Sequence, residues 1–521
     1  MKKNKLMISI LSILNVCRSI MLVLSSILSK FLLDNAINNL LDKAIHYGIL
    51  FATSIILNIV LTLIYFYIKH RFSLKIEVYY KKVLYDELLK KEVKTIKGIH
   101  TGELSNIYLQ DLNKYRIGIV ETIPSIFLYS SRFILAFIAL IFFDWRLLIA
   151  LLSIGLIGSL GAFLYSKKMK KAHMESLKSD GEVNSFMQES FENIHMVKAL
   201  EANSNFSSSL NDKLNDNYSK KNKRNLIVLF GSGGLFTLMQ ITSALTLLYG
   251  VYALMYLGLT YGTLIGLIQI VSYFESPLTQ VSSILNKYNA YKASKERIEK
   301  IFLLENDKEQ IIIDDFTSIE FENVSFSYDK EIFSHFSYKI EKNDTILIKG
   351  PSGRGKTTFL YLLLGFIKPE EGRIIVRSKD KIYDVNQVRS LFSYVSQTNI
   401  LFSGSIKENF SLFVKDVKEE DIIASLKIAQ VYDEIMEKNN KLDTKLNEKG
   451  DGLSIGQIQR ILIAINLLVD HPILLLDEFT SSLDYSLERR IVENIASLNK
   501  TKIIVSHRNI DLKGAKELIL D

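Results

Sequence analysis

Cysteine is almost absent from this sequence, which has a single one, Cys17, among 521 residues. One thiol excludes an internal disulfide and a metal site built from several cysteines. Only five prolines are present, and no Pro-rich or low-complexity segment separates the two halves of the chain, which predicts a stiff join. No internal repeat is evident. No small-residue cleavage site follows the first apolar run, so we expect an uncleaved first span.

The apolar residues are concentrated in long blocks in the first part of the chain. Hydrophobic residues make up 48% of the sequence, and the mean hydropathy is +0.16. A chain of this length is too long for one core, so at least two domains are expected. The blocks approach the length that a bilayer requires. We predict about six membrane helices, near Leu6–Leu33, Tyr47–Ile68, Ile119–Phe143, Leu147–Tyr165, Leu226–Tyr256 and Thr263–Leu285.

The connections between these spans are of two kinds: short outer ones, and long inner ones that are rich in Lys and Arg. The formal net charge is +8, and much of the Lys and Arg excess lies in the two long connections. The positive-inside rule places these connections, both termini and the second domain in the cytoplasm. The same rule accounts for the basic charge, so we expect a multi-pass protein of the cytoplasmic membrane, embedded in the lipid bilayer, with no nucleic-acid partner.

The long inner connections keep helical apolar spacing, so we expect the spans to continue as helices beyond the membrane. Their turning points, Thr101–Leu104 and Phe191–Leu200, are candidates for contact with the second domain, although plain helix–helix turns explain them equally well. Strand-like alternation begins at Ser318–Tyr328. We predict a membrane domain over residues 1–300 and a mixed α/β domain over residues 316–521.

A glycine-rich segment follows a strand pattern, Thr345–Lys349, and precedes a helical pattern, Thr358–Leu364. Its sequence is Gly350-Pro351-Ser352-Gly353-Arg354-Gly355-Lys356-Thr357. Glycines let backbone N–H groups close around phosphate oxygens, and the helix N-terminus adds partial positive charge. Lys356 can reach the β- and γ-phosphates, and the Thr357 hydroxyl can ligate Mg²⁺. In this strand–loop–helix setting the motif predicts a phosphate loop.

A second apolar strand pattern, Ile473–Leu476, ends in two carboxylates, Asp477 and Glu478. Asp477 can hold Mg²⁺ through water, as a partner of the phosphate loop. Glu478 is suited to polarise the attacking water as a general base. A strand that simply ends in solvated acids is the alternative, and the phosphate loop argues against it.

Several segments resemble the motifs of ABC transporter ATPases. Leu453-Ser454-Ile455-Gly456-Gln457 resembles the family signature. The other matches are Tyr328 for the adenine-stacking aromatic, Gln397 for the Q-loop, Leu401–Asn409 for an exporter segment, Glu448 for the loop that senses the membrane helices, Ser481–Asp484 for the D-loop and His507 for the switch histidine. The resemblance covers nearly the whole chain, and Thr101–Leu104 and Gln188–Ser190 sit where exporter coupling segments sit.

The resemblance implies an exporter-type half-transporter, with an all-α six-helix transmembrane domain followed by an α/β P-loop ATPase domain of ABC type. It implies ATP and Mg²⁺ as cofactors, the metal being held near Thr357, Gln397 and Asp477. The implied catalytic residues are Glu478, His507 and Gln397. The implied ATP contacts are Tyr328, Gly350, Pro351, Ser352, Gly353, Arg354, Gly355, Lys356, Thr357, Thr358, Ser454, Gly456 and Gln457. Each ATP would lie between the phosphate loop of one copy and the signature of a second copy.

Three departures from the family pattern bear on these expectations. Ile455 replaces the first glycine of the signature, and Ala464–Asn466 stands where the family has Ala-Arg-Ala. The chain ends at Asp521, so we expect a short ATP domain. Glu478 and His507 are kept, which favours active sites and a homodimer. The altered signature leaves a heterodimer with a related half open.

One acidic residue, Glu275, lies within the sixth predicted span. A charge at mid-membrane costs roughly 2.5–3.5 kcal/mol, so it should face a cavity or a partner. Glu275 is either a candidate cargo site for a cationic group or an interhelical contact beside Pro277. Arg18 and Arg132 could pair with it, or extend toward the cytoplasmic face.

The leading hypothesis is ATP-driven export of a peptide or amphiphilic small molecule by alternating access. The first span begins almost at Met1, so we expect no peptidase domain, and a peptide cargo would be exported already processed. A lipid or multidrug flippase and a non-transporting regulatory ABC protein are the alternatives. Intact Lys356, Asp477 and Glu478 argue against the regulatory protein.

Overall fold

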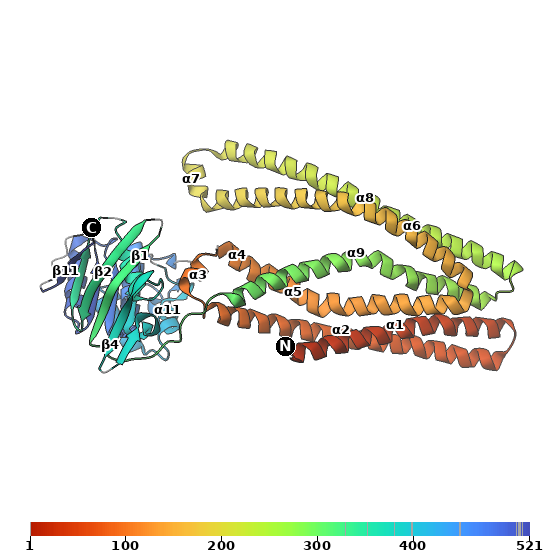
Figure 1. The fold of residues 1–521 in the computed structure, drawn as a ribbon, viewed down its shortest axis with the longest axis horizontal. Helices are drawn as coiled ribbons and strands as arrows, with labels where there is room; N and C mark the ends of the chain where they lie inside the picture. The colour runs from red at the N-terminus through yellow and green to blue at the C-terminus, as the bar shows by residue number, and fades with distance from the viewer. Residues whose placement is uncertain are drawn as a thin grey trace. The chain divides into compact units, whose positions relative to one another are not determined.

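The computed structural model describes residues 2–99, 101–328, 330–351, 353–379, 381–397, 400–447, 450–506, 508, 512 and 514–520; within its helices the side chains of residues 2–4, 156–167, 232 and 235 are not described. The chain forms two compact units (Figure 1). The first combines Met1–Asp86 with Thr101–Leu303, and the second combines Glu87–His100 with Leu304–Asp521. The short segment Glu87–His100 therefore packs with the second unit, although it precedes most of the first in sequence.

The first unit is built from helices. They are α1 (Lys2–Ile37), α2 (Leu41–Leu88), α4 (Thr101–Asn106), η1 (Ile107–Asp111), α5 (Leu112–Ile117), η2 (Gly118–Thr122), α6 (Ile123–Glu192), α7 (Ile194–Ala199), α8 (Asn203–Tyr256) and α9 (Tyr261–Leu303). Helix α6 is interrupted at Asp144, whose backbone is non-helical with φ −164° and ψ 104°. The predicted third and fourth spans meet at this point. In Figure 1, α7 lies at the turn that joins α6 to α8.

Four helical stretches among the described residues are long and apolar enough to cross a membrane. They are Lys5–Ile37, Leu41–Leu88, Thr101–Gly155 and Asn203–Tyr256. The predicted fourth span falls partly on residues 156–167, whose side chains are not described, and the count of six stays a prediction. The helices extend well past the length of a bilayer, since α2 alone has 48 residues.

Polar side chains join the helices of the first unit. Ser131 on α6 donates a hydrogen bond to Ser19 on α1 at 2.9 Å, and the Asn15 amide donates to the Pro124 carbonyl at 2.9 Å. At the far end of α1, Asp34 accepts from the backbone N–H of Gly262 on α9 at 2.9 Å. Hydrogen bonds of this kind hold helices together where the lipid provides no hydrophobic driving force.

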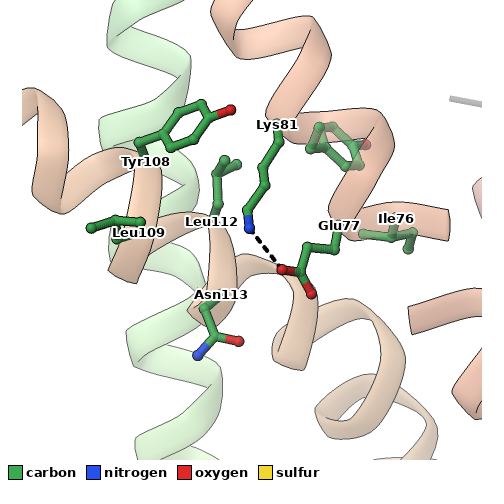
Figure 2. Close-up of a pocket in the computed structure, with 8 residues that line it drawn as sticks. Ile76, Glu77, Lys81, Tyr108, Leu109, Leu112 and Asn113 are labelled. Atoms are coloured by element: carbon green, nitrogen blue, oxygen red, sulfur yellow. Dashed lines mark hydrogen bonds and ion pairs between the residues drawn. The ribbon is translucent and has the colours of Figure 1, made fainter. Parts of the chain in front are cut away.

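A small hollow lies between α2 and the η1–α5 segment (Figure 2). Lys81 crosses it and pairs with Glu77 one turn earlier on α2, at 2.8 Å. Tyr108 and Asn113 line the other side. The ion pair links neighbouring turns of one helix, so this hollow is a packing feature of the helical unit.

The second unit contains two main sheets and several helices. Its strands are β1 (Ser318–Ser327), β2 (Glu331–Glu341), β3 (Thr345–Lys349), β4 (Glu371–Ser378), β5 (Lys381–Asp384), β6 (Phe392–Val395), β7 (Gly404–Ser405), β8 (Lys445–Leu446), β9 (Ile473–Asp477), β10 (Thr501–Val505) and β11 (Lys516–Ile519). Its helices are α3 (Val93–Lys97), α10 (Lys356–Leu363), η3 (Val385–Gln387), η4 (Arg389–Leu391), α11 (Ile406–Phe413), α12 (Glu419–Ile428), α13 (Tyr432–Met436), η5 (Lys441–Asp443), α14 (Ile455–Val469) and α15 (Tyr485–Ala496).

The larger sheet is parallel and has the order β11-β3-β10-β9-β6. Val505 pairs with both Ile348 and Asp477, and Val395 pairs with Leu476. Strands β3, β6, β9 and β10 therefore end at one edge of the sheet, which is where parallel sheets carry their sites. The smaller sheet is antiparallel with the order β2-β1-β4-β5.

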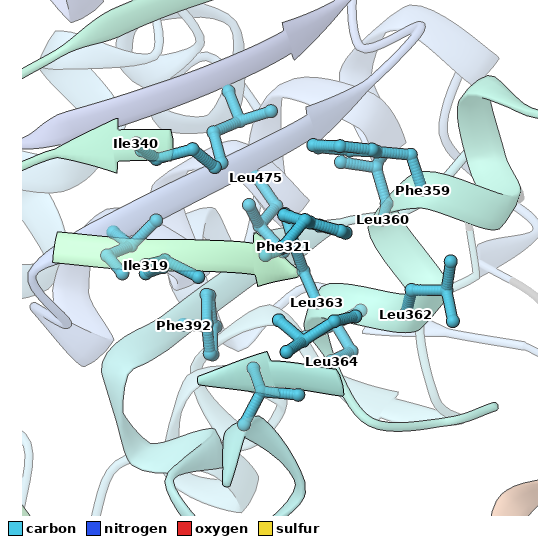
Figure 3. Packing of buried hydrophobic residues seen from close by; sticks show 14 of the residues in the cluster. Ile319, Phe321, Ile340, Phe359, Leu360, Leu362, Leu363, Leu364, Phe392 and Leu475 are labelled. Carbon is cyan, nitrogen blue, oxygen red and sulfur yellow. The ribbon is translucent and has the colours of Figure 1, made fainter. Parts of the chain in front are cut away.

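One hydrophobic core of this unit lies between the two sheets and α10 (Figure 3). Phe359 on α10 is fully buried and stacks on Phe321 of β1, with ring centroids 4.7 Å apart. Leu360 and Leu363 on the same helix are also fully buried against the cluster. The core thus fixes the helix that begins at Lys356.

We expect Phe359→Ala to destabilise the second unit by about 3–5 kcal/mol, because it removes a stacked ring and leaves a cavity. Differential scanning calorimetry of the full-length protein would show a lower transition temperature. The control is Ile382→Ala on β5, where the side chain is 58% exposed. Equal melting of the two variants would contradict this account of the core.

Candidate functional site

The predicted phosphate loop connects β3 to α10. Lys356 turns back over the loop and donates hydrogen bonds to the carbonyls of Gly350 and Pro351, at 2.8 and 2.9 Å. Burial lowers the pKa of Lys356, while Glu478 and Asp477 act in the opposite direction. Two backbone carbonyls of the loop thus fix the position of the ammonium group.

Two glycines of this loop cannot be replaced without moving the backbone or its neighbours. Gly355 has φ +89°, and a Cβ there would lie 2.4 Å from Cγ2 of Ile332. Gly350 has φ +151°, and a Cβ there would lie 2.3 Å from the carbonyl oxygen of Leu520. Both conformations are ones that side chains rarely adopt. The loop is consequently shaped by its glycines, as the spacing predicted.

An acidic site lies beside the loop. The Thr357 hydroxyl donates to Asp477 Oδ2 at 3.0 Å. Asp477 Oδ1 is buried and has no hydrogen-bond partner within the described part of the chain. Burial raises the pKa of Asp477, Glu478 raises it further, and the Thr357 hydroxyl lowers it. The Thr357 hydroxyl and the Asp477 carboxylate together offer the oxygen ligands that Mg²⁺ prefers.

Glu478 follows β9 in a left-handed backbone conformation, with φ +48°. Its N–H donates to the Val505 carbonyl at 3.0 Å, and its carboxylate accepts from the Gln397 amide at 2.8 Å. A left-handed conformation at a residue other than glycine stores strain and is most common at functional sites. The strained turn places the carboxylate beside Gln397 instead of continuing along the strand.

The signature segment forms the start of α14. Ser454 caps this helix: its hydroxyl accepts from the Gln457 N–H at 3.2 Å, and the Gln457 side chain accepts from the Ser454 N–H at 3.0 Å. Ile455, the departure from the family pattern, is 65% exposed. The isoleucine side chain therefore does not disturb the cap, which depends on Ser454 and Gln457 alone.

A charge pair between the buried Arg460 and the partly exposed Glu434 stabilises the same helix. Arg460 donates to both carboxylate oxygens of Glu434 on α13, at 2.6 and 2.9 Å. The Gln457 amide also donates to Glu434, at 2.8 Å. Burial raises the pKa of Glu434, but the Arg460 and Gln457 hydrogen bonds outweigh it and lower the pKa overall. Glu434 therefore stays ionised and orients the first turn of α14.

The structure brings the predicted residues together in groups. The loop residues around Lys356 lie with Gln397, Asp477 and Glu478 at one edge of the sheet. Ser454, Gly456 and Gln457 form a separate group at α14. Tyr328 is 59% exposed and lies edge-on to Phe326. The remaining loop residues are Gly353 and Arg354 before α10 and Thr358 within it. Ser352, Glu448 and His507 lie outside the described residues.

Glu275 lies in the first unit, on α9. It is 6% exposed and accepts a hydrogen bond from Thr242 on α8. No ion pair from Arg18 or Arg132 to Glu275 occurs among the side chains that the structure describes. The contact joins two helices, and the cargo role remains a prediction.

Comparison with known families decides the class of the protein. The family of the ABC transporter transmembrane region matches residues 6–278, and the ABC transporter family matches residues 333–481. The chain belongs to the ABC transporter family. The transporter thus fuses a membrane domain to an ABC ATP-binding domain, and its architecture is that of an exporter.

Relatives and a solved structure agree with this assignment. A protein of Rickettsia bellii described as an export ATP-binding/permease protein is 29% identical, over 99% of this chain and 92% of its own. The lactococcin-A transport/processing ATP-binding protein of Lactococcus lactis is 28% identical, over 78% of this chain and 58% of its own. A bacterial Atm1-family ABC exporter solved with ATP bound has the same fold, with a TM-score of 0.80, 19% identity, and coverage of 100% of this chain and 93% of that one.

Gln459 is a site residue of the transporter that the sequence analysis missed. It is fully buried on α14, its amide donates to the Glu478 carbonyl at 3.2 Å, and it accepts from the Ser482 hydroxyl. Gln459 therefore links the signature helix, the Glu478 turn and the D-loop segment. The sequence did contain a signal for Gln459, because it is a polar residue on the apolar side of α14.

Tyr394 was also missed. Its hydroxyl lies 3.5 Å from Asp477 Oδ2. Burial, followed by the negative charge of Asp477, raises the pKa of Tyr394, so the phenol stays protonated. It can therefore act only as a neutral donor toward the carboxylate.

The segment before the predicted turn Thr101–Leu104 packs on the ATP-binding domain. Lys91 is buried and donates to the Leu304 carbonyl at 3.0 Å and to the Asn306 side chain at 2.7 Å. Glu92 pairs with Lys368. The Lys97 ammonium lies 4.5 Å from the centre of the Tyr361 ring on α10. The same helix α10 begins at Lys356, so this segment contacts the helix that follows the phosphate loop.

We expect Gln459→Ala to lower the ATPase turnover of the transporter about tenfold while ATP affinity stays the same. The change frees the Glu478 carbonyl and the Ser482 hydroxyl, but leaves the phosphate loop intact. The measurements are steady-state ATPase and equilibrium ATP binding on the full-length protein in lipid.

Gln430→Ala is the matched control, because its side-chain amide donates to the nearby Lys427 carbonyl and, among the described residues, to no residue of the site. A wild-type turnover in Gln459→Ala, or an equal loss in both variants, would contradict the proposed link to Glu478.

Proposed function

We propose that the transporter hydrolyses ATP to export a peptide or an amphiphilic small molecule across the cytoplasmic membrane by alternating access. The observation that supports hydrolysis is the convergence of Lys356, Asp477, Glu478 and Gln397 at one edge of the parallel sheet. This arrangement has a positive charge for the phosphates, oxygen ligands for a metal, and a carboxylate for the attacking water.

Each residue has a role that its geometry supports. Lys356 would exchange its contacts with two loop carbonyls for the β- and γ-phosphates. Thr357 and Asp477, with Gln397 nearby, would hold Mg²⁺, which when bound neutralises charge developing on the phosphate oxygens. Glu478 would accept a proton from the attacking water, and Gln397 would orient that carboxylate. His507, by its match to the switch histidine, would contact the γ-phosphate.

The separation of the two site groups supports a dimer. Among the described contacts, none joins Ser454 or Gly456 to the phosphate loop of the same chain, and the first turn of α14 presents its N-terminus with Ile455 exposed. A helix N-terminus is suited to bind a phosphate. A second copy, or a related half-transporter, would supply this group to each ATP.

The segment Glu87–His100 would couple the ATP site to the membrane helices. It continues directly from α2, and Lys97 contacts Tyr361 on α10. Closure of the ATP site would therefore act on α2 through a short path of contacts. The orientation with the ATP domain in the cytoplasm rests on the basic inner connections.

Glu478→Gln is expected to abolish steady-state ATPase, by about 10²-fold or more, because the general base is lost while the side chain keeps its size. Full-length protein in lipid nanodiscs would be assayed beside Glu493→Gln, a change at an exposed ion pair with Arg489 on α15.

Robust wild-type turnover that is lost only in Glu478→Gln supports a self-sufficient homodimer. Negligible wild-type turnover would overturn the homodimer and direct the search to a partner subunit. Equal turnover in wild type and Glu478→Gln would remove Glu478 from the catalytic step.

We expect Glu275→Gln to lower the stimulation of ATPase by a cationic amphiphile such as dodecyltrimethylammonium if Glu275 contacts the cargo. The control is Asp42→Asn in the first turn of α2. Unchanged stimulation would leave the Thr242 hydrogen bond as the role of Glu275.

A further inference from the structure

We propose that Arg132, with Arg18 beside it, binds the anionic head group of an amphiphilic ligand inside the membrane domain. The proposal deepens the proposed export function by naming a ligand class, and it rests on that function for its role in transport. The site lies entirely within the first unit.

The two arginines lie at similar depths in the helical bundle. The residues next to them, Ser19 and Ser131, are hydrogen-bonded at 2.9 Å. With a rise of about 1.5 Å per residue, Arg132 lies about 18 Å from Asp144 and Arg18 about 24 Å from Asp34. Asp144 interrupts α6, and Asp34 lies in the last turn of α1 and binds the start of α9. Measured from these points, both arginines fall within a hydrocarbon layer about 30 Å thick.

Neither guanidinium group has a carboxylate partner among the described side chains. Arg18 donates to the Thr62 hydroxyl and the Asn15 amide oxygen, both at 2.9 Å, and lies over the Tyr65 ring. The Nε of Arg132 is buried and has no hydrogen-bond acceptor, and its guanidinium lies 5.9 Å from the Tyr129 ring centre. The undescribed side chains of residues 156–167 include no Asp or Glu.

The charge at this depth is unbalanced. Glu275 lies about 20 Å from Gly262 at the start of α9, a similar depth by the same helical rise. Its carboxylate accepts from Thr242, on a different helix from either arginine. Two guanidinium groups outnumber the one carboxylate at this depth, and uncompensated charge is costly in a membrane. A negatively charged ligand would offset the excess positive charge.

An apolar hollow lies against Tyr129, the ring that Arg132 faces. It has a volume of about 610 Å³ and is lined by residues of α6 and α9, among them Tyr129, Phe133, Pro277, Val281 and Tyr288. Tyr129 lines the hollow, and the Arg132 guanidinium lies over its ring. An apolar body could therefore occupy the hollow while its anionic end reaches Arg132, which selects an anionic amphiphile over a bare anion.

The test compares three probes of equal chain length on the full-length protein in phosphatidylcholine nanodiscs without nucleotide. The probes are N-dodecanoylglycine, its neutral methyl ester and dodecyltrimethylammonium, titrated calorimetrically with empty nanodiscs subtracted. We expect the anionic probe to bind wild type at least tenfold more tightly than the ester. In Arg132→Gln this preference should fall to about twofold or less, and in Arg132→Lys most of it should remain.

The matched control is Arg146→Gln, since Arg146 lies next to Trp145 in the turn region of α6, away from the site. It should keep the full preference for the anionic probe. A purely structural role for Arg132 would weaken all three probes equally, and that result would overturn the proposal. If Arg132→Gln does not fold, Arg132→Lys is the test. A retained preference for the anionic probe would support the proposal, and equal weakening of the anionic and neutral probes would overturn it.

Two sources of the ligand are separated by lipid composition. Nanodiscs containing phosphatidylglycerol should weaken binding of the anionic probe in wild type more than in Arg132→Gln if a lipid head group fills the site. Equal weakening in both assigns the site to a molecule other than lipid. Absence of any charge preference in wild type would overturn the proposal, and because no ATP is present, this failure is distinct from a failure of ATP hydrolysis.

Discussion

The register of the parallel sheet is the constraint on which the ATP-binding domain depends. Val505 aligns with Ile348 and Asp477, so the strands that carry the phosphate loop and the Asp477–Glu478 pair end at one edge. A slip of one residue in β9 would turn Asp477 to the opposite face of the sheet, because side chains alternate along a strand. Its 3.0 Å contact with Thr357 would then be lost. The chemistry of the site is therefore a consequence of backbone pairing between distant segments.

Contacts from other elements hold that edge in place. Gln459 on α14 binds the backbone of Glu478, and the Phe359 face of α10 is buried in the core while Tyr361 on the same helix meets Lys97. The ATP site is thus linked to the signature helix on one side and to the segment that continues α2 on the other. These links are short and packed, so a displacement of either element would act on the loop or on Glu478.

The helices of the membrane domain are held together by other interactions, because burial of apolar surface does not favour helix association in lipid. Hydrogen bonds such as Ser131 to Ser19 and Thr242 to Glu275 connect its helices instead. Among the described side chains, the buried Nε of Arg132 has no hydrogen-bond acceptor. An apolar hollow lies against Tyr129, the ring that this arginine faces, and this combination favours an anionic amphiphile.

The sequence alone determined what depends on local chemistry. The glycine spacing of the phosphate loop and the apolar helices are set within a few residues, so their patterns could be recognised directly, and the ABC family assignment was confirmed. Tertiary structure decided what depends on pairing between distant segments: the contact of Gln397 with Glu478 across 81 positions, the role of Gln459, and the packing of Glu87–His100 with the ATP domain. Such partners are chosen by strand register and helix packing, which local patterns leave free.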